Sequence, residues 1–361
     1  CRRDFFRWPK WQYNMKILSN KNKKLISSIL SMPRITYEIN ENDSNQRLDK
    51  FAKKLLLDTP LAGIYKMIRS KDIVVNGLKT EQDYILQEGD SVRIFHREDP
   101  TSTKVDKSRQ KSVEDKKVDT ERKDYNFRSM ILYEDEDFVC INKPPHLNVH
   151  PWDHKTKEVS LIELALDYYK GKYNSLTFKP SLVHRIDRQT TGCVLIAKNK
   201  PTLDALLTLL QSQQIEKIYH TITIENSQTK PRDTIRSKLE RYDAGGGSKV
   251  RVSEVWEPSV THYSTLKNLS NKYRLIECRL ETGRMHQIRV HLSSIGLPIV
   301  GDGYYGEKWE NSFAKRTYGI DHQLLHAYRL SFEHPRTRKQ LNIIAAYPKD
   351  FEEFILSVIK A

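Results

Sequence analysis

Cysteine is scarce in this 361-residue sequence and never occurs as a close pair. The four cysteines are Cys1, Cys140, Cys193 and Cys278, so the sequence has neither a C-x-x-C redox motif nor a cysteine-based zinc motif. Three of them fall in apolar, strand-like runs, where a reduced thiol behaves as a small hydrophobic side chain. We therefore expect free thiols in a reducing compartment, which favours a cytoplasmic location.

Long apolar runs and several catalytic signatures are also missing. No stretch approaches the ~20 apolar residues that a membrane-spanning helix requires. His286 and His291 are five apart, and His322 and His326 are four apart without the glutamate of an H-E-x-x-H motif. There is no phosphate-binding glycine loop with a D-F-G segment, and no G-x-S-x-G elbow. These absences argue against zinc hydrolases, phosphoryl-transfer enzymes and serine hydrolases, and we expect no metal and no cofactor.

Positive charge is in clear excess, with 61 Lys and Arg against 46 Asp and Glu, a formal net charge of +15. A polyanion is the partner class that such an excess favours, and nucleic acid leads. An anionic membrane surface is the alternative, but it would require a basic amphipathic helix with aromatic anchors. We expect no membrane contact, and nothing in the sequence demands a partner chain, so a monomer is predicted.

Two segments are predicted to lack a fold of their own. Residues 1–35 begin with a basic stretch in which Asp4 is the only acid up to residue 31, which indicates a disordered tail. The same composition leaves open an organelle-targeting peptide. Residues 98–127 are crowded with charges of both signs and have few apolar residues, so they cannot bury enough surface to offset their ordering entropy. We interpret them as a flexible linker.

Residues 36–97 predict a small module in which two helices are followed by strands. Leu48, Phe51 and Ala52 have helical spacing, and a second apolar helical face begins at Leu61. A strand at 73–75, an Asn-Gly turn and a strand at 91–95 follow.

Lys66, Arg69 and Lys71 gather around the second predicted helix, on the side that its apolar face leaves free. Such a surface suits contacts to RNA phosphates, and the alternative is a small globular module with ordinary solvated charges. The module resembles the S4 RNA-binding domain in the segments Arg47-Leu48-Asp49, Val74-Val75-Asn76-Gly77 and Gly89-Asp90-x-Val92. That resemblance implies RNA binding without naming a reaction.

Residues 128–361 predict one larger α+β domain with a mostly antiparallel mixed sheet. The predicted strands are 138–142, 193–198, 217–224, 250–255, 273–281 and 286–292. Helices are predicted at 160–170 and 201–213, the second opening with Pro201 in its first turn.

Asp187 is the residue that suggests chemistry. It interrupts an apolar strand pattern between Arg185 and Arg188, where a charge is costly unless it is paired or used. A structural ion pair at a turn is the alternative reading. A carboxylate beside arginine is expected to be ionised, as a nucleophile or base, and a tyrosine such as Tyr219 could join it in chemistry on a ribosyl or base carbon. The surrounding arginines and histidines could hold a flipped-out nucleotide.

The chain resembles the RluA-type pseudouridine synthases that carry an N-terminal S4 domain and act on large-subunit ribosomal RNA. The resemblance covers residues 36–95 and 131–350 and rests on three segments: HRIDRQTTG at 184–192, TGRMHQIRVH at 282–291 and LHAYRLSFEHP at 325–335. Two positions depart mildly from the family pattern, Ile186 in place of Leu and Thr191 in place of Ser. Residues 256–263 follow the family only loosely, and 243–252 form an unusual basic, glycine-rich loop.

The resemblance implies a role for each matching residue. Asp187 corresponds to the essential aspartate, Tyr219 to the active-site tyrosine and Arg284 to the basic residue that pairs with the aspartate. Arg185 would hold the flipped-out RNA conformation, with His184 and Arg289 as further RNA contacts. The implied reaction converts uridine to pseudouridine. Two alternatives remain: a non-catalytic RNA-binding or ribosome-assembly protein on this fold, and a different base-modifying or glycosidic enzyme.

Overall fold

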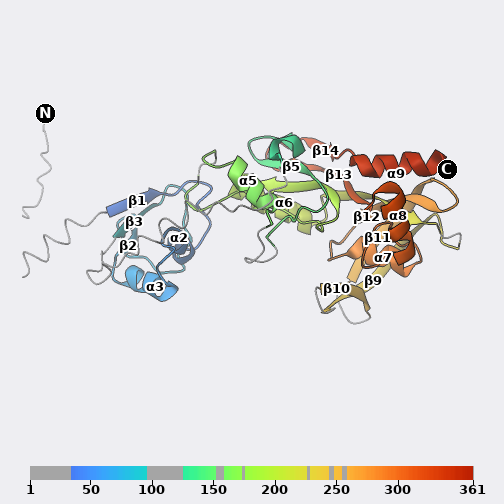
Figure 1. The fold of residues 1–361 in the computed structure, drawn as a ribbon. Coiled ribbons are helices and arrows are strands. Elements are labelled where there is room, and N and C mark those ends of the chain that lie inside the picture. Colours follow the sequence, from blue (N-terminus) through green and yellow to red (C-terminus); the bar gives the residue numbers. More distant parts are fainter. Residues whose placement is uncertain are drawn as a thin grey trace, which may run out of the picture. The chain divides into compact units, whose positions relative to one another are not determined.

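Figure 1 shows the computed structural model, coloured along the sequence. The residues that it describes are 34–95, 125–151, 158–172, 175–225, 228–243, 248–253 and 258–360. The chain divides into two compact units, Cys1–Lys116 and Lys117–Ala361, here called the N-terminal and C-terminal units. Residues 1–33 of the predicted tail and most of the predicted linker lie outside the described residues, whereas Arg34 and Ile35, which were assigned to the tail, belong to strand β1. No described helix is long and apolar enough to cross a membrane.

The N-terminal unit packs two helices against a small antiparallel sheet of order β1-β3-β2. Its elements are β1 (Arg34–Glu38), α2 (Leu48–Leu55), α3 (Leu61–Arg69), β2 (Ile73–Val75) and β3 (Ser91–Phe95). The predicted apolar faces of both helices are buried: Leu48 and Phe51 from α2 meet Ile64 and Ile68 from α3 in one core. Both predicted helices are therefore confirmed.

The Asn76-Gly77 turn brings together two segments on which the S4 resemblance rests. Both residues have positive φ, +52° and +77°, and the flanking Val75 and Leu78 exchange backbone hydrogen bonds. The Asn76 amide donates to Asp90 Oδ1 (2.8 Å), and its oxygen accepts from the backbone N–H of Ser91 (2.9 Å). Asparagine tolerates this left-handed conformation and pins the turn to β3.

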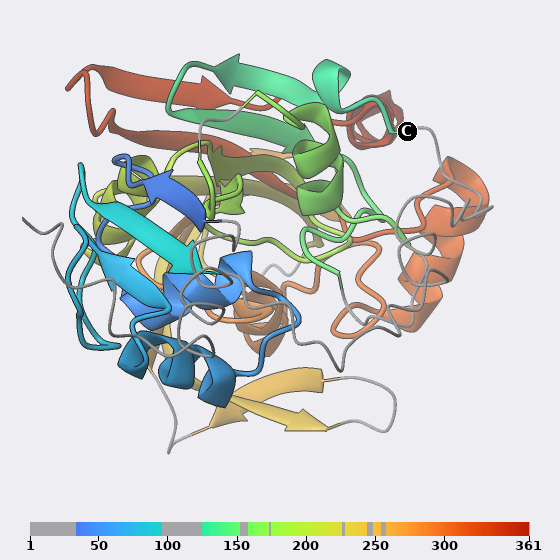
Figure 2. The same ribbon diagram turned by 90° about the vertical axis from the view of Figure 1, so that its left-hand side faces the viewer.

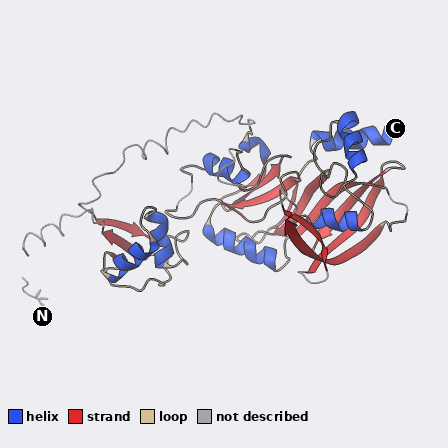
Figure 3. Cartoon of the chain, turned by 60° about the horizontal axis from the view of Figure 1, so that its bottom comes forward, coloured by secondary structure: helices blue, strands red, loops and turns tan. Residues whose placement is uncertain are grey.

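The C-terminal unit is built on one 11-stranded sheet. Its strands are β4 (Ile131–Glu134), β5 (Phe138–Lys143), β6 (Ser181–Leu182), β7 (Thr191–Ala197), β8 (Glu216–Ile224), β9 (Arg232–Asp243), β10 (Ser248–Ser253), β11 (Pro258–Asn268), β12 (Tyr273–Leu280), β13 (Leu325–Glu333) and β14 (Gln340–Ile344). The order is β10-β9-β11-β12-β8-β13-β7-β5-β4, with β14 on β13 and β6 on β7. The β7–β13 pair is parallel and the other described pairs are antiparallel, which confirms the predicted α+β class (Figure 3).

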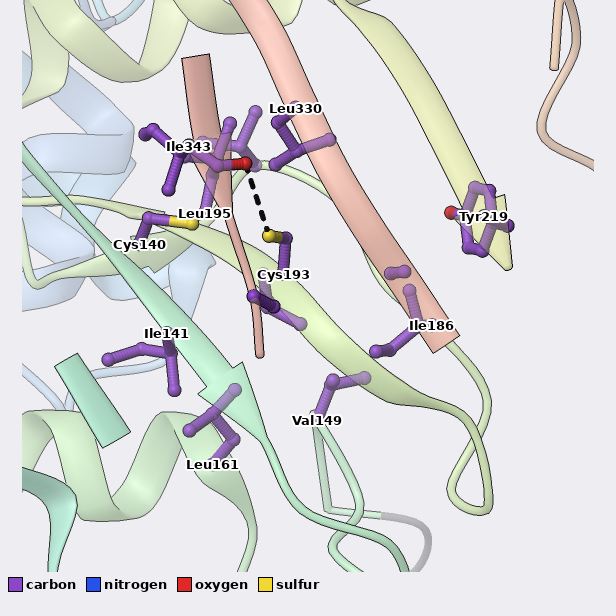
Figure 4. Packing of buried hydrophobic residues seen from close by; sticks show 14 of the residues in the cluster. Cys140, Ile141, Val149, Leu161, Ile186, Cys193, Leu195, Tyr219, Leu330 and Ile343 are labelled. Atoms are coloured by element: carbon purple, nitrogen blue, oxygen red, sulfur yellow. Dashed lines mark hydrogen bonds between the residues drawn. The ribbon is translucent and has the colours of Figure 1, made fainter. Parts of the chain in front are cut away.

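Central strands of this sheet are buried on both faces. Every residue of β7 is buried, and so are all residues of β8 between its two ends. Figure 4 shows Cys140 and Cys193 inside the resulting cluster, where the Cys193 thiol lies 3.7 Å from the carbonyl oxygen of Ile343. Cys140, Cys193 and Cys278 are free and buried, as expected of small hydrophobic residues, while Cys1 lies outside the described residues.

Helices lie alongside the sheet (Figure 2). They are η1 (Phe127–Met130), a 3-10 helix, α5 (Leu161–Tyr168), α6 (Lys200–Gln211), α7 (Gln287–Ser294), α8 (Lys308–Tyr318) and α9 (Lys349–Lys360). The two predicted helices are confirmed as α5 and α6. Ser160 and Glu163 form a capping box at the start of α5, and the Asn199 side chain accepts from Thr202 N–H at the start of α6.

The strand predicted at 286–292 is wrong, because this segment forms α7. Ile288, Val290 and Leu292 alternate with polar residues, and that spacing is typical of a strand. All six residues from Gln287 to Leu292 are buried, so α7 has no solvated face and no amphipathic stripe that would reveal a helix. His286, which precedes the helix, takes a left-handed conformation with φ of +56°.

Candidate active site

Asp187 lies in the loop between β6 and β7, and this loop is fastened to the segment leading into β13. The Gln323 amide donates to Thr190 Oγ1 (2.7 Å), and the Thr191 hydroxyl is 2.8 Å from Nδ1 of His326. His326 Nε2 donates to a backbone carbonyl, so its Nδ1 accepts from Thr191 and the ring is neutral. The HRIDRQTTG segment (184–192) and the LHAYRLSFEHP segment (325–335) are therefore in contact.

Gly192 is the last residue of the HRIDRQTTG segment, at the point where the backbones of β7 and β13 lie very close together. Its φ is +105°, and a Cβ there would lie 2.3 Å from the carbonyl oxygen of Ala327 on β13. No other residue type fits that approach without moving β7 away from β13. The glycine thus keeps the start of β7, and the loop before it, in place.

Lys143, at the end of β5, binds the loop between β6 and β7. No role was assigned to this lysine from the sequence. Its side chain is fully buried, and Nζ donates to the carbonyls of Pro144, Leu147 and Arg188 at 2.8, 3.0 and 2.9 Å. Burial lowers the pKa of Lys143 to about 7, an effect that the nearby Asp187 charge opposes. A lysine at the end of a buried strand was the available signal, because lysine is rarely buried without partners.

Arg289 on α7 joins two carboxylates. Its Nη1 donates to Asp187 Oδ2 (2.9 Å), while Nε and Nη2 donate to the two oxygens of Asp302 at 2.7 and 2.9 Å. Asp302 and Arg289 are buried, and 27% of the Asp187 side chain is exposed. The guanidinium holds the pKa of Asp302 below its ordinary value, although burial alone would raise it. Arg289 therefore holds the Asp187 side chain in place and is itself held by the buried Asp302.

The pairing that the resemblance assigned to Arg284 is corrected: Arg289 pairs with Asp187. Arg284 lines the pocket beside Asp187, and its backbone N–H donates to the Gln287 side chain (3.0 Å). Arg289 was expected to contact RNA, but its guanidinium is buried between Asp187 and Asp302. The helical form of α7 explains the exchange, since it turns residue 289 inward where a strand register would not.

Tyr219 on β8 lines the same pocket as Asp187. Figure 4 shows its side chain at the edge of the buried cluster. Burial raises the pKa of its phenol, and the negative charge of Asp187 raises it further. The side chain therefore stays a neutral phenol at physiological pH. It can stack on a base or donate a hydrogen bond, and it is not poised to lose its proton.

His286 is a site residue whose location the sequence did not reveal. Its Nε2 lies 3.9 Å from Asp187 Oδ2, and its Nδ1 is 2.9 Å from the hydroxyl of Tyr305. Burial lowers the pKa of His286, with the Asp187 charge acting in the opposite sense. Its neighbour in sequence, Gln287, binds back to β11 through the carbonyl of Val260 (3.0 Å). The TGRMHQIRVH segment thus supplies both the partner of Asp187 and part of the pocket wall.

Asp187 and Tyr219 line one pocket of about 80 Å³. Its other lining residues are Arg185, Ile186, Thr190, Leu280, Gly283, Arg284, His286, Gln287, Ile288, Arg289 and Leu325. The volume is well below that of sites for drug-sized ligands, so the pocket suits a single ring and not a stretch of RNA. Polar groups gather at Asp187, while Leu280, Ile288 and Leu325 are apolar.

The predicted RNA contacts divide into exposed and inward-facing residues. Arg185 is exposed and lines the pocket. His184 faces inward, where its Nε2 accepts from the backbone N–H of Leu195 (3.2 Å). Burial lowers the pKa of His184 to about 4, so its ring is neutral at physiological pH. In the N-terminal unit, the predicted contacts Lys66, Arg69 and Lys71 are exposed on and just after α3.

Asp135, Asp137 and His334 form the one cluster of described residues with a metal-like arrangement. Nδ1 of His334 accepts from two backbone N–H groups, and its Nε2 donates to Asp135 Oδ2 (2.9 Å). The Arg336 side chain donates to Asp137 Oδ2 (2.6 Å). These bonds already use the ligand atoms, so the cluster acts as a cross-link between the β13–β14 and β4–β5 hairpins.

A larger hollow of about 480 Å³ lies over β8, β9, β11 and β12 and contains none of the predicted site residues. Of its charged lining residues, Arg329 pairs with Glu216 (3.2 Å) and Asp233 pairs with Lys230 outside the hollow (2.9 Å). The Asp187 pocket, which contains the predicted catalytic residues, is therefore the candidate active site.

Comparison with known proteins gives one consistent result. The family model described as RNA pseudouridylate synthase matches residues 137–294. A Bacillus subtilis protein named uncharacterized RNA pseudouridine synthase YlyB is 30% identical over 91% of this chain and 99% of its own length. A Buchnera aphidicola protein named ribosomal large subunit pseudouridine synthase C is 34% identical over 87% of this chain and 93% of its own length.

The chain belongs to the RluA-type RNA pseudouridine synthases. A solved human structure, RNA Pseudouridylate Synthase Domain Containing 4, has a similar fold, with a TM-score of 0.52 and 24% identity over 65% of this chain and 94% of its own length. The synthase acts on RNA. The family match includes Asp187, Tyr219 and Arg289 within its bounds.

Proposed function

We propose that this pseudouridine synthase modifies uridines of large-subunit ribosomal RNA. Relatives from Buchnera and Haemophilus are named for that RNA, and the Haemophilus ducreyi protein is 33% identical over 86% of this chain. The excess of positive charge supports a large polyanionic substrate. The observation that carries the assignment of the site is the Asp187–Arg289 pair at a ring-sized pocket beside Tyr219.

Asp187 is the residue that acts on the target nucleotide in this proposal. Arg289 binds its Oδ2, and among the described residues none is bonded to Oδ1, which is left for the substrate. The carboxylate acts at the sugar as nucleophile or as base while the N1–C1′ bond breaks. The base then turns within the pocket and a C5–C1′ bond forms. C5 loses its proton and N1 gains one. Atoms balance without any co-reactant, since the product is an isomer of uridine.

Tyr219 and the apolar walls confine the base between bond breaking and bond formation. A neutral phenol can lie against the uracil ring without adding charge. Leu280, Ile288 and Leu325 keep water from the pocket, so the detached base is retained. Arg185, exposed at the same pocket, is placed to hold the RNA strand from which the nucleotide is extruded.

The test is tritium release from C5-labelled uridine in large-subunit ribosomal RNA transcripts and in subunit precursors. We expect release with the unaltered chain and none with Asp187→Asn, which keeps the size of the side chain. Asp204→Asn is the matched control, because Asp204 is an exposed aspartate on α6 paired with Lys200. Absence of release with the unaltered chain on both RNAs would favour the RNA-binding alternative. Release of free uracil would favour a base-removing enzyme.

We propose in addition that the N-terminal unit is an S4-type RNA-binding domain. Its exposed Lys66, Arg69 and Lys71 supply phosphate contacts that help offset the few kcal/mol needed to extrude a base. Deleting residues 1–100 should therefore weaken RNA affinity more than it slows reaction of bound RNA. Equal affinity of the shortened chain in filter binding would contradict this role.

We also propose that the synthase works in the cytoplasm as a monomer. Its buried free thiols at Cys140, Cys193 and Cys278 suit a reducing compartment. Light scattering of the full chain, with and without RNA, would measure its mass, and a dimer would contradict the proposal.

A further inference from the structure

Tyr304 stands out because it is a large aromatic residue exposed beside the active-site pocket. Its exposed fraction is 54%, and its hydroxyl has no hydrogen-bond partner among the described residues. The ring lies nearly parallel to that of His286, a pocket-lining residue, with centroids 6.1 Å apart and an interplanar angle of 28°. The Arg289 guanidinium lies 5.7 Å from the ring centroid.

The loop that carries Tyr304 is held by the same carboxylate that holds Arg289. Asp302 Oδ1 accepts from the backbone N–H groups of Tyr304 (2.9 Å) and Tyr305 (3.1 Å), while Asp302 also binds the guanidinium. A continuous chain of hydrogen bonds therefore runs from Asp187 through Arg289 and Asp302 to the backbone of residue 304. The backbone that carries the exposed ring is thus held in place relative to the catalytic aspartate.

Lys249 on β10 adds a cation to this ring. Its Nζ lies 5.0 Å from the centroid of Tyr304, and no described carboxylate pairs with it. The β9–β10 hairpin that carries it extends from the body of the unit (Figures 1 and 2) and is fixed to the same loop, because the N–H of Val250 donates to the Tyr305 hydroxyl (2.8 Å). An exposed ring with a cation beside it is the arrangement by which proteins stack single-stranded nucleobases and bind the adjoining phosphate.

Trp309 on α8 shows what distinguishes Tyr304 from an ordinary surface aromatic. It is 60% exposed, and Lys272 Nζ lies 4.6 Å from its ring. That lysine, however, is paired with Glu310 (2.7 Å). Lys272 also precedes β12 at the end opposite the pocket residue Leu280, a separation of about 25 Å at the usual rise per strand residue. Trp309 therefore has a ring and a lysine, but that lysine is paired and lies far from the Asp187 pocket.

We propose that Tyr304 is a stacking platform for a nucleobase that neighbours the target uridine in the RNA strand, with Lys249 contacting a phosphate beside that base. This inference rests on the proposed function, since it assigns a second nucleotide of the same substrate. When the target nucleotide enters the pocket, its neighbour loses a stacking partner, and the Tyr304 ring replaces it. The platform would thereby favour RNA in which the adjoining nucleotide is unpaired.

The experiment measures the dissociation constant of the full chain for a large-subunit ribosomal RNA fragment, together with pseudouridine formation in it. Tyr304→Ala should weaken binding about 10-fold, within the range known for one base–aromatic stack. Tyr304→Phe keeps the ring and should restore most of the missing affinity. Trp309→Ala, the control for removal of an exposed aromatic, should bind within about twofold of the unaltered chain.

Abasic substitution identifies the partner of the ring. Each nucleotide flanking the target uridine is made abasic in turn, and binding is measured for the unaltered chain and Tyr304→Ala. At one flank the abasic RNA should weaken binding by the unaltered chain as much as Tyr304→Ala does, and the two changes together should cost no more than either. Fully additive effects at both flanks, or unchanged binding by Tyr304→Ala in an RNA that the chain modifies, would overturn the platform alone. No product from the unaltered chain would overturn the proposed function and this inference with it.

Discussion

The two units use cations in opposite ways. In the C-terminal unit, Arg289 and Lys143 are buried, and their donors bind carboxylates or backbone carbonyls. In the N-terminal unit, Lys66, Arg69 and Lys71 face solvent. A buried cation with several partners fixes geometry, because moving it would leave groups unpaired in a low dielectric. An exposed cation fixes little and contributes long-range attraction to RNA. Net charge alone does not separate these two uses.

The largest expected effect is from Arg289→Met. This change leaves Asp302 buried without its cation and removes the support of Asp187, so we expect a decrease of about 3–5 kcal/mol in the free energy of unfolding. Pseudouridine formation should fall below detection. Arg69→Met, at an exposed position of α3, is the matched control and should alter stability by less than about 0.5 kcal/mol. Urea unfolding of both variants measures the difference.

A double variant separates stability from positioning of the aspartate. Arg289→Met with Asp302→Asn removes both buried charges and keeps an oxygen that can accept from Tyr304 and Tyr305. It should recover part of the stability but not the activity, because Asp187 still lacks its partner. Recovery of activity together with stability would show that Arg289 acts only in folding.

Lys143→Met is expected to have the next largest effect. It leaves the carbonyls of Pro144, Leu147 and Arg188 without a donor, and we expect a decrease of at least about 2 kcal/mol in the free energy of unfolding. Lys66→Met, in the exposed set, is the control. A Lys143→Met variant as stable as the control would break the contrast between buried and exposed cations.

Acid should destabilise the C-terminal unit through its neutral histidines. Burial lowers the pKa of His184, His291 and His326 to about 4, below the ordinary 6.5 of the unfolded chain. The unfolded chain therefore binds more protons between these values, and stability falls as pH drops from about 6.5 to 4, by up to about 1.4 kcal/mol per pH unit for each histidine. Urea unfolding at pH 7.5, 6 and 5 tests this, and His326→Gln should flatten the dependence. Residues 34–95 contain no histidine and should lack this response.

Much of the central fold could be predicted because its pattern is local. The runs in β5, β7, β8 and β12 are apolar enough to indicate buried strands, and Pro201 marks the start of α6. The long strand β9 was missed, since it carries charged residues such as Arg236 and Lys238 on an exposed face, and β11, rich in Ser and Thr, was missed as well. The amphipathic helix α9 was missed too.

The site was harder to predict than the fold, because it depends on which residues the chain brings together. Asp187 and Tyr219 could be named from the sequence segments. The exchange of Arg284 for Arg289 could not be foreseen, since it depends on α7 being a helix buried on all sides. Asp302 lies 115 positions after Asp187, in a Gly-Asp-Gly segment to which no role was assigned from the sequence. Only the folded chain shows that Asp302 binds Arg289.

The smallest expected effect on stability is from removal of the three exposed cations Lys66, Arg69 and Lys71. Changing Lys66, Arg69 and Lys71 together to alanine removes charges without a buried partner, so the free energy of unfolding should change little. RNA affinity should fall, and the slope of log Kd against log salt should become shallower by about 0.7–0.9 for each phosphate that the variant no longer binds. Titration of labelled ribosomal RNA at several salt concentrations measures both. Lys200→Ala, on α6 of the other unit and paired with Asp204, is the control for removal of one exposed cation. If the triple variant kept the slope of the unaltered chain, α3 would not face RNA, and the exposed cations would serve only solubility.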